Sequence, residues 1–499
     1  MNARMSNGQS MLVNRYGGMR VVILGAARQG LASARFFLGA GARVTVSDLR
    51  QRGQLATAVA ELEAHRNQMA SDPAWRGELS FALGGHPESL LDGADLLCLS
   101  GGVSPGIPLV QLAIQRGIPL TNDSQLTLEH CPAPVIGITG SAGKTTTTTV
   151  IGLMLSQAGF PVHVGGNIGM PLLDRLERIG AGDKVVLELS SFQLELMSLS
   201  PRIAGLLNIT PNHLDRHPSM GHYAAAKSGI LRFQSCGDTC VLNAEDSYTG
   251  SWYASGRCHI DADEGHEEVY FPLQGARLGF ALKREVANGA FLRGGRLVWR
   301  RPGLVDAEVC DKGEVRLRGE HNLANLLAAC CVAGAAGATA SAMGEVARNF
   351  GGVEHRLEIV RVHRGVTWVN DSIATAPERT MAALRSFTEP LVVLLGGRDK
   401  HLPWEECARE LRQRARQVIL FGEAAGLIEE ALAAEAAASG VTAPPALRCP
   451  SLTEAVEAAA RQARQGYVVL LAPGCTSYDA YEDFAARGRH FRELVEALP

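Results

Sequence analysis

Residues 135–146 carry the side chains whose types and spacing most clearly suggest chemistry. Their sequence, VIGITGSAGKTT, runs from an apolar strand through a glycine-rich turn into the start of a helix. Glycines in such a turn let backbone N–H groups point at an anion, and the helix N-terminus adds partial positive charge. Lys144 would reach phosphate oxygens and the Thr145 hydroxyl would ligate Mg²⁺. Ile138 replaces the first glycine of the strict P-loop pattern, but an ordinary turn rarely carries Gly-Lys-Thr-Thr, so the segment predicts a nucleotide-phosphate site.

Two polar clusters follow apolar strands in the same region. Glu188 comes directly after the buried strand predicted at 184–187, and the segment 208–217 offers His213 and Asp215. Ligands bind at the carboxyl ends of strands in open α/β sheets, and a carboxylate there suits Mg²⁺. Each cluster alone is typical of an ordinary polar strand end. Together with the phosphate loop they predict a domain that binds Mg-ATP.

The N-terminal region predicts a strand, helix and strand unit. Apolar residues 21–24 lead into Gly25-Ala-Ala-Arg-Gln-Gly30, and a second strand is expected at 43–47. With Asp48 about 20 residues further on, this pattern is typical of dinucleotide binding. Ala27 stands where the middle glycine lets a pyrophosphate approach the backbone, which weakens that interpretation. An NAD-dependent oxidoreductase therefore stays an alternative, although it leaves the Gly-Lys-Thr-Thr turn unused.

The chain divides at residues that interrupt helices. Prolines 132 and 134 mark one boundary, and Gly351-Gly352 after alanine-rich helices marks another. The predicted domains are residues 1–131, 132–352 and 353–499. Alternating strands and helices predict an α/β protein with a Rossmann-like N-terminal domain, a central P-loop domain on a parallel sheet, and a C-terminal Rossmann-like α/β domain. Further expectations are helix over 51–77, a β-rich elaboration over 248–318, strands at 95–100, 184–189, 204–209, 365–370, 391–395, 417–421 and 467–472, and helices over 322–350 and 424–439.

The composition argues against a nucleic-acid-binding, exported or membrane-spanning protein. The 499 residues are 46% hydrophobic and 20% charged, with a net charge of −3, so the chain lacks the basic field that nucleic-acid binding needs. No apolar run of 18 residues and no signal-peptide pattern is visible, which predicts neither export nor a membrane span. We expect residues 1–18 to be a leader without an assigned function. The 11 cysteines form no CxxC pair, as is typical of a protein in the reducing cytoplasm.

A set of motifs then resembles the Mur ligase family across nearly the whole chain. In order they are GSAGKTT, ELSSFQ, NITPNHLDRH, YAAAK, GEHNLAN, GVEHRLE, NDSIATAP, GGRDK and CTSYDAYEDFAARG. Within the family, ELSSFQ and the C-terminal block are most similar to members that join glutamate to UDP-N-acetylmuramoyl-L-alanine. They are less similar to the members that add alanine, diaminopimelate or D-Ala-D-Ala, and to folylpolyglutamate synthase.

The resemblance implies roles at the ATP site. The residues implied to contact ATP are Gly140, Ser141, Ala142, Gly143, Lys144, Thr145, Thr146, Asn322, Asn325, Arg356 and Asp371. Two Mg²⁺ ions would be held by Thr145, Glu188, His213 and the carbamate of Lys227. Lys144, Glu188, His213 and Lys227 would be the catalytic residues. Without the resemblance, Lys227 is typical of a surface lysine on a helix.

The resemblance also implies two substrate sites. The implied contacts to the UDP-muramoyl substrate are Arg28, Gln29, Asp48, Arg50, Ser104, Asn167, Ser190 and Gln193. The implied contacts to the incoming glutamate are Thr375, Lys400, Ser477 and Phe484. The family sequence NDSKAT is NDSIAT here, so Ile373 replaces a lysine near the amino acid. That change leaves D-glutamate, which is the more favoured, and L-glutamate both open.

The reaction that the resemblance implies needs both the ATP site and the two substrate sites. A carboxylate must be activated as an acyl phosphate before an amine can attack it, and closure of the third domain would exclude water from that intermediate. We expect a cytoplasmic monomer that uses ATP, Mg²⁺, glutamate and UDP-N-acetylmuramoyl-L-alanine. A P-loop kinase or a nucleotide-driven binding module would explain Gly-Lys-Thr-Thr but not NDSIAT or Lys400.

Overall fold

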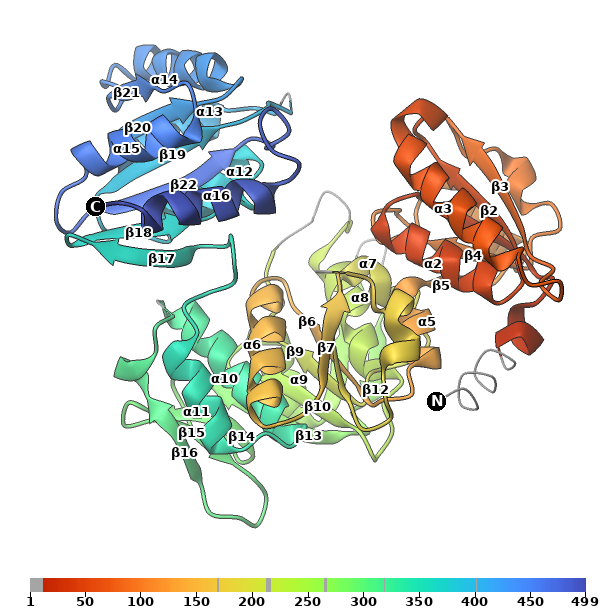
Figure 1. The fold of residues 1–499 in the computed structure, drawn as a ribbon. Coiled ribbons are helices and arrows are strands. Elements are labelled where there is room, and N and C mark those ends of the chain that lie inside the picture. Colours follow the sequence, from red (N-terminus) through yellow and green to blue (C-terminus); the bar gives the residue numbers. More distant parts are fainter. Residues whose placement is uncertain (1–11, 168–169, 212–216, 264–266, 318, 401) are drawn as a thin grey trace. The chain divides into compact units, whose positions relative to one another are not determined.

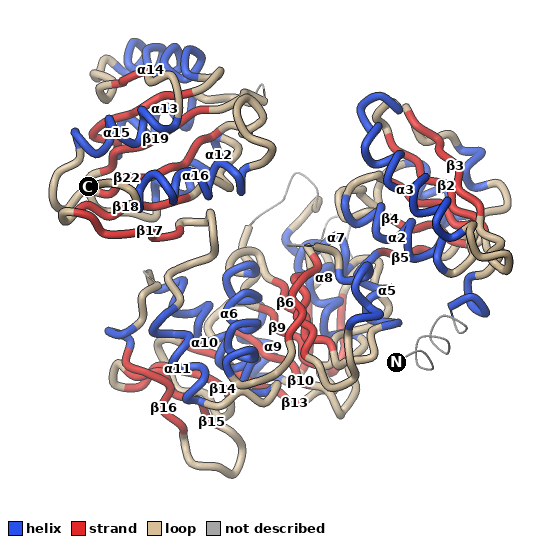
Figure 2. Tube along the Cα trace, viewed as in Figure 1, coloured by secondary structure: helices blue, strands red, loops and turns tan. Residues whose placement is uncertain are grey.

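The computed structural model describes residues 12–499 except 168–169, 212–216, 264–266, 318 and 401. The chain forms two compact units, Met1–Asn349 and Phe350–Pro499. The first unit contains two mainly parallel sheets with their helices, and the second contains one (Figures 1 and 2). The predicted α/β class with three sheet-based domains is therefore confirmed. Within the described residues, no helix has both the length and the apolar character needed to cross a membrane.

The N-terminal sheet is parallel, with strand order β3-β2-β1-β4-β5. Its strands are β1 (Arg20–Leu24), β2 (Arg43–Asp48), β3 (Glu78–Leu83), β4 (Leu96–Leu99) and β5 (Leu120–Asn122). Its helices are α2 (Arg28–Gly39), α3 (Ala56–Met69), α4 (Pro108–Gln115) and α5 (Asp123–His130), with short turns η1 (Arg52–Leu55) and η2 (Glu88–Leu91). Residues 21–24 of β1 are all apolar because Ile23 faces one hydrophobic core and Leu24 the core on the other side.

Two expectations for this domain need correction. The helix expected over 51–77 ends at Met69, and the sheet continues with β3 at an edge. Strand β3 escaped prediction because its side chains are only half-buried, so the sequence lacks a continuous apolar run. The expected leader is wrong at Tyr16, which is 4% exposed and packs edge-on against Phe37. Residues 1–11 of that leader lie outside the described part of the chain.

The central sheet has nine strands in the order β16-β15-β14-β13-β10-β9-β6-β8-β7. They are β6 (Val135–Thr139), β7 (Val162–Gly166), β8 (Lys184–Glu188), β9 (Ile203–Leu206), β10 (Thr239–Asn243), β13 (Ala276–Ala281), β14 (Gly289–Arg293), β15 (Arg296–Arg300) and β16 (Ala307–Asp311). The strands from β7 to β14 pair in parallel, whereas β15 and β16 are antiparallel. The expected parallel sheet is thus correct for the strands around the phosphate loop and wrong at one edge, where Gly294-Gly295 turns the chain back as a hairpin.

Helices and a small ribbon complete this domain. They are α6 (Lys144–Gln157), α7 (Ser191–Leu194), α8 (Met220–Arg232), α9 (Ser247–Ser255), α10 (Glu320–Ala335), α11 (Ala340–Asn349), turns η3 (Leu172–Arg178) and η4 (Lys312–Glu314), and the antiparallel pair β11 (Arg257–Ile260) and β12 (Val269–Pro272). Helix α8 packs into the core formed by β8 and β9. Helix α10 lies against α6 and against strands β9 and β13.

Hydrogen bonds and an ion pair join the two sheets of the first unit. Asn122, which caps α5, donates its amide to the Gln193 carbonyl at 2.9 Å. The Gln193 amide donates in turn to Ser124 Oγ at 2.8 Å. Arg35 of α2 makes a two-pronged pair with Asp174, with Nη2 to Oδ2 at 2.7 Å. These contacts explain why the first two domains form one compact unit.

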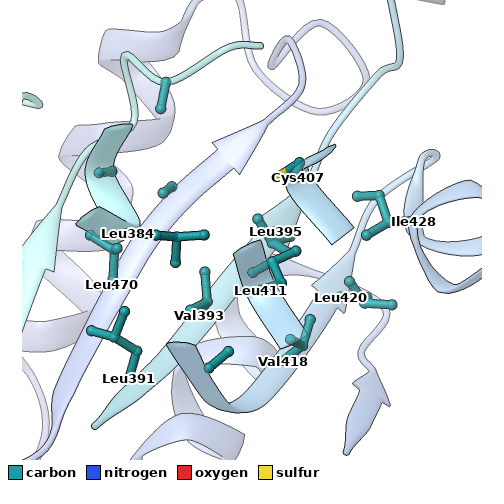
Figure 3. Packing of buried hydrophobic residues seen from close by; sticks show 14 of the residues in the cluster. Leu384, Leu391, Val393, Leu395, Cys407, Leu411, Val418, Leu420, Ile428 and Leu470 are labelled. Atoms are coloured by element: carbon teal, nitrogen blue, oxygen red, sulfur yellow. The ribbon is translucent and has the colours of Figure 1, made fainter. Parts of the chain in front are cut away.

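The second unit has a six-stranded sheet in the order β17-β18-β22-β19-β20-β21. Its elements are β17 (Glu358–His363), β18 (Val366–Asn370), α12 (Pro377–Arg385), β19 (Leu391–Gly396), α13 (Glu405–Arg414), β20 (Ala415–Phe421), α14 (Ala425–Ser439), β21 (Ala446–Arg448), α15 (Leu452–Gln462), β22 (Val468–Gly474) and α16 (Phe484–Glu496). Strand β17 alone is antiparallel to its neighbour. Leu391, Val393 and Leu395 of β19 face the core in Figure 3, while Val392 and Leu394 face the opposite core.

Arg487 in α16 has no exposed surface. Its guanidinium donates to Ser372 Oγ at 3.0 Å and to the carbonyls of Ser372 and Cys475 at 3.0 and 3.2 Å. It also donates to the carbonyls of Thr476 and Gly396. Burial lowers the pKa of Arg487 to about 10, so it stays charged near neutral pH. One side chain thereby joins the end of β19 to the loops that follow β18 and β22.

We expect Arg487→Ala to lower the free energy of unfolding by about 2–4 kcal/mol, because several buried carbonyls would lose their donor. Arg489→Ala on the same helix is the control, since Arg489 is half-exposed and its nearest carboxylate, that of Glu482, lies 3.9 Å away. It should change stability by about 0.5 kcal/mol or less. Urea unfolding of both variants measures the difference, and equal losses would contradict the role given to Arg487.

Candidate functional site

The phosphate loop lies between β6 and α6, as the sequence predicts. Gly143 caps α6 with a left-handed backbone, φ +83°. A Cβ placed there would come within 2.1 Å of Asn325 Oδ1. Glycine is therefore required both by the backbone conformation and by the approach of α10 to the loop. Thr145 and Thr146 lie half-buried in the first turn of α6.

Two lysines converge on one carbonyl of this loop. Lys144 Nζ donates to the Gly140 oxygen at 2.8 Å and to the Ser141 oxygen at 3.3 Å, while Lys227 Nζ donates to the Gly140 oxygen at 3.0 Å. Lys227 is 1% exposed, so it is not the surface lysine that the helix pattern alone would suggest. Burial, together with repulsion from Lys144, holds the pKa of Lys227 well below its usual value, and Glu188 acts in the opposite direction. The arrangement favours a neutral Lys227 amine or an anion close by.

Glu188 ends β8 and is 2% exposed. Its Oε1 accepts a hydrogen bond from Asn167 Nδ2 at 3.2 Å, while its Oε2 is buried without any partner. A buried carboxylate oxygen without a partner is costly unless a cation or a donor reaches it. The residues present therefore fit a divalent cation at Glu188. His213, the other expected magnesium ligand on a strand end, lies outside the described residues.

The loop after β9 holds the phosphate loop from the other side. Asn208 Oδ1 accepts from the Ala142 N–H at 2.9 Å, and Asn208 Nδ2 donates to the Ala142 carbonyl at 3.1 Å. Ser141 Oγ donates to the Thr210 carbonyl at 2.9 Å. Asn208 was not among the expected site residues, although it opens the NITPNH motif. Its position directly after a buried strand was the available signal.

The asparagines of α10 lie beside the same loop. Asn325 Nδ2 donates to Asn322 Oδ1 at 3.4 Å, as the spacing of one helical turn allows. Asn325 is 8% exposed and its oxygen faces Gly143. The structure therefore brings the phosphate loop, Glu188, Lys227 and Asn325 together in one domain.

The N-terminal candidates gather at the carboxyl ends of β1, β2 and β4. Asp48 accepts from the Ala26 N–H at 2.8 Å and from Arg50 at 2.8 and 2.9 Å. The Arg50 guanidinium holds the pKa of Asp48 far below its usual range. Gln29 Oε1 accepts from the Gly101 N–H at 2.9 Å, and Arg28 begins α2 with an exposed side chain. Asp48 and Gln29 thus fix the backbone at this edge of the sheet, where Arg28 and Arg50 supply positive charge.

The remaining UDP-substrate candidates differ in accessibility. Gln193 is 1% exposed, and its Oε1 accepts from Ser190 N and Oγ, both at 2.9 Å. Its amide is also used to join the two sheets, so the geometry favours a positioning role. Ser104 Oγ accepts from the Gly106 N–H at 3.2 Å and lines a cavity of about 590 Å³. Asn167 is exposed beside Glu188.

Within the second unit, the amino-acid candidates form a smaller group. Lys400 Nζ donates to Thr375 Oγ1 at 3.3 Å. Ser477 is 2% exposed and Phe484 is 36% exposed. Burial and the nearby charge of Arg379 lower the pKa of Lys400. The structure therefore joins Thr375 to Lys400 directly, while Ser477 lies in the loop after β22.

Asp371 and Arg356 belong to the same unit. The Asp371 carboxylate accepts from the Leu357 N–H at 3.0 Å, and burial raises the pKa of Asp371 to about 6. Positive charge from Arg356 and Arg379 opposes that rise. Arg379 Nη1 also donates to the Ile373 carbonyl at 3.3 Å. The guanidinium of Arg379, which was not among the expected site residues, thus lies beside the position where the family has a lysine.

Known families match the three domains in order. Residues 19–122 match the Mur ligase MurD-like N-terminal domain, residues 138–333 the Mur ligase middle domain, and residues 355–475 the Mur ligase glutamate ligase domain. The chain belongs to the Mur ligase family, and it is an ATP-dependent ligase. The predicted family resemblance is confirmed, and the oxidoreductase and kinase alternatives are excluded.

Proteins with assigned names are similar to this chain over almost its whole length. A protein of Symbiobacterium thermophilum named UDP-N-acetylmuramoylalanine--D-glutamate ligase is 41% identical over 96% of this chain and 98% of its own. Proteins of the same name from Pelotomaculum thermopropionicum and Acetivibrio thermocellus are 37% and 34% identical, over 96% and 100% of this chain and 98% and 100% of their own.

Solved structures share the fold. MurF from Acinetobacter baumannii gives a TM-score of 0.54 at 15% identity, covering 98% of each chain. The UDP-N-acetylmuramate-alanine ligase MurC from Thermotoga maritima gives 0.51 at 19% identity, covering 96% of this chain and 99% of that one. At these identities the similarity concerns the fold alone.

We expect Gly143→Ala to weaken nucleotide binding at least tenfold, because the added Cβ would push Asn325 away from the loop. Isothermal titration with ADP measures the affinity. Gly159→Ala at the other end of α6 is the matched control, since Gly159 has φ +89° and an added Cβ would meet nothing within 4 Å. Both substitutions should cost about 1–2 kcal/mol of stability from backbone strain. Unchanged ADP affinity in Gly143→Ala would show that the contact with Asn325 is dispensable.

Proposed function

We propose that this chain joins D-glutamate to UDP-N-acetylmuramoyl-L-alanine at the expense of ATP, in cytoplasmic synthesis of peptidoglycan precursors. The observation that carries the proposal is the burial of Lys227 beside Lys144 and Glu188 at the phosphate loop. This group of charges suits phosphoryl transfer, which depends on positioning and charge neutralisation. The names of the relatives in the same family support the choice of substrates. The 11 cysteines are all free thiols, as suits the cytoplasm.

The phosphate loop would hold the ATP phosphates. The backbone N–H groups from Gly143 to Thr146, at the N-terminus of α6, would provide donors and positive charge. Lys144 would exchange its bond to the Gly140 carbonyl for a phosphate oxygen. The terminal carboxylate of the UDP-muramoyl substrate attacks the γ-phosphorus and ADP leaves, and the glutamate amine then displaces phosphate from the acyl phosphate. Asn322 and Asn325 would contact the adenosine, and the second unit would contribute Arg356 and Asp371.

Lys227 would act as a carbamate. Carbamate formation joins CO₂ to a neutral amine and releases one proton, so a lysine whose pKa is held low by burial and by Lys144 is suited to it. The product carries a negative charge in place of a positive one, which removes the repulsion between Lys227 and Lys144. Thr145, Glu188, His213 and the carbamate would hold two Mg²⁺ ions. Magnesium would supply neutralisation of charge on the transferred phosphoryl group.

Substrate selection is proposed for the two outer domains. The side chains at the carboxyl ends of β1, β2 and β4 would bind the UDP moiety, with Arg28, Gln29, Asp48 and Arg50 as contacts. Further contacts to this substrate would come from Ser104, Asn167, Ser190 and Gln193. Glutamate would meet Thr375, Lys400, Ser477 and Phe484. Arg379 places a positive charge beside Ile373, which supports retention of the acidic amino acid despite the missing lysine.

Purified protein with Mg-ATP should release phosphate only when UDP-N-acetylmuramoyl-L-alanine and D-glutamate are both present, and mass spectrometry should show one added glutamyl residue. Replacing D-glutamate with L-glutamate should reduce the rate to background. A product with L-glutamate alone would overturn the assignment of the enantiomer. Phosphate release without either substrate would favour an uncoupled nucleotidase.

We expect Lys227→Gln to lower kcat by about a hundredfold or more, because the anionic carbamate can no longer form. Lys312→Gln is the control, since Lys312 lies on the surface of the same domain away from the phosphate loop. The wild-type protein prepared in ¹³C-bicarbonate should show a carbamate resonance that is absent from Lys227→Gln and kept in Lys312→Gln. A wild-type spectrum without this resonance would refute the carbamate.

A further inference from the structure

Three side chains outside the phosphate site converge on one point of the first unit. They are Glu195, which follows α7, His217, and His222 in the first turn of α8. His217 Nδ1 lies 3.1 Å from His222 Nδ1 and 3.3 Å from Glu195 Oε1. One ligand atom from each of the three lies within 4.8 Å of the others. None of these residues was expected to be functional from the sequence.

The spacing of these atoms fits the coordination of a metal ion. Tetrahedral zinc binds nitrogen at about 2.0–2.1 Å, which places neighbouring ligand atoms about 3.3 Å apart. Two imidazole nitrogens and one carboxylate oxygen are a common protein ligand set for such an ion, and three protein ligands leave a position open. Glu195 and His222 line the cavity of about 590 Å³ that also contains Ser104 and Arg232. The open position has room for water or a small ligand.

The surroundings of His217 give a second, independent observation. The His217 ring is 1% exposed and stacks on Phe192 with an interplanar angle of 3°. Its Nε2 lies 2.9 Å from Ser191 Oγ, so the hydroxyl can fix the ring and leave Nδ1 facing Glu195 and His222. A ligating histidine usually makes such a hydrogen bond through its other ring nitrogen. The ring is therefore already oriented as a metal ligand would be.

We infer that Glu195, His217 and His222 bind one divalent transition-metal ion of the kind that prefers imidazole, such as Zn²⁺ or Co²⁺. Magnesium prefers oxygen ligands, so this site is distinct in chemistry from the one at Glu188. The bound ion ties the turn after α7 to the start of α8, the helix that carries Lys227. The site goes beyond the proposed ligase activity and does not depend on it.

The test uses the full-length protein stripped of metal, in millimolar Mg²⁺ and without nucleotide. Equilibrium dialysis with Zn²⁺ should find one tightly held ion per chain, and Co²⁺ should give a visible ligand-field band. His222→Gln and, separately, Glu195→Gln should weaken Zn²⁺ binding at least tenfold and abolish the band. Zinc should raise the melting temperature of the wild type but not of these variants, because binding to the folded state alone stabilises it.

Two controls separate the site from other histidines and from the ligase site. His259→Gln should keep full binding, because His259 pairs with Glu268 at 2.9 Å but belongs to no such three-residue group among the described residues. Glu188→Gln should also keep Zn²⁺ binding, whatever happens to its activity. Equal zinc affinity in the wild type, His222→Gln and Glu195→Gln would overturn the inference and leave the ligase proposal intact.

Discussion

Two lysine side chains share one acceptor in the central domain of this protein. Lys144 and Lys227 both donate to the Gly140 carbonyl, and Lys227 is almost completely buried. Neighbouring like charges in a region of low dielectric are costly, so the site favours a phosphate, a carbamate or a deprotonated amine. Glu188 lies close enough to influence the pKa of Lys227 and has an oxygen without a partner. The site is thus incomplete electrostatically until an anion and a cation arrive.

The fold keeps this arrangement in place from several directions. Strand β8 delivers Glu188, α8 delivers Lys227, and the loop after β9 fixes the phosphate loop through Asn208. Parallel strands make this possible because their carboxyl ends lie at one edge of the sheet. The added antiparallel strands β15 and β16 lie at the far edge of the strand order and leave this part unchanged.

Buried polar side chains organise other parts of both units. Gln193 joins the first two sheets through Asn122 and Ser124, and Arg487 holds three segments of the second unit together. These polar groups are fully hydrogen-bonded, and each connects segments far apart in the sequence. Such networks favour one arrangement of the loops, because a partly satisfied network would cost free energy.

Much of the architecture could be read from local patterns. The strand at 135–139, the phosphate loop and the helix after it are where the sequence predicts them, because apolar runs and glycines act over a few residues. Strands β3 and β17 escaped prediction since their side chains are only partly buried, so no continuous apolar run marks them. The motifs resembling a family supplied the site residues, whose individual roles stay predictions.

The sequence by itself determined the phosphate loop, the α/β class and the family, since each rests on residue types at short spacing. The tertiary structure decided what long-range packing controls. It buried Lys227, which a helix pattern alone assigns to the surface, and committed Gln193 to joining two sheets. It also brought Glu195, His217 and His222 together and placed Arg379 beside Ile373. Burial and electrostatic neighbours depend on segments that meet only in the folded chain, so local sequence could not reveal them.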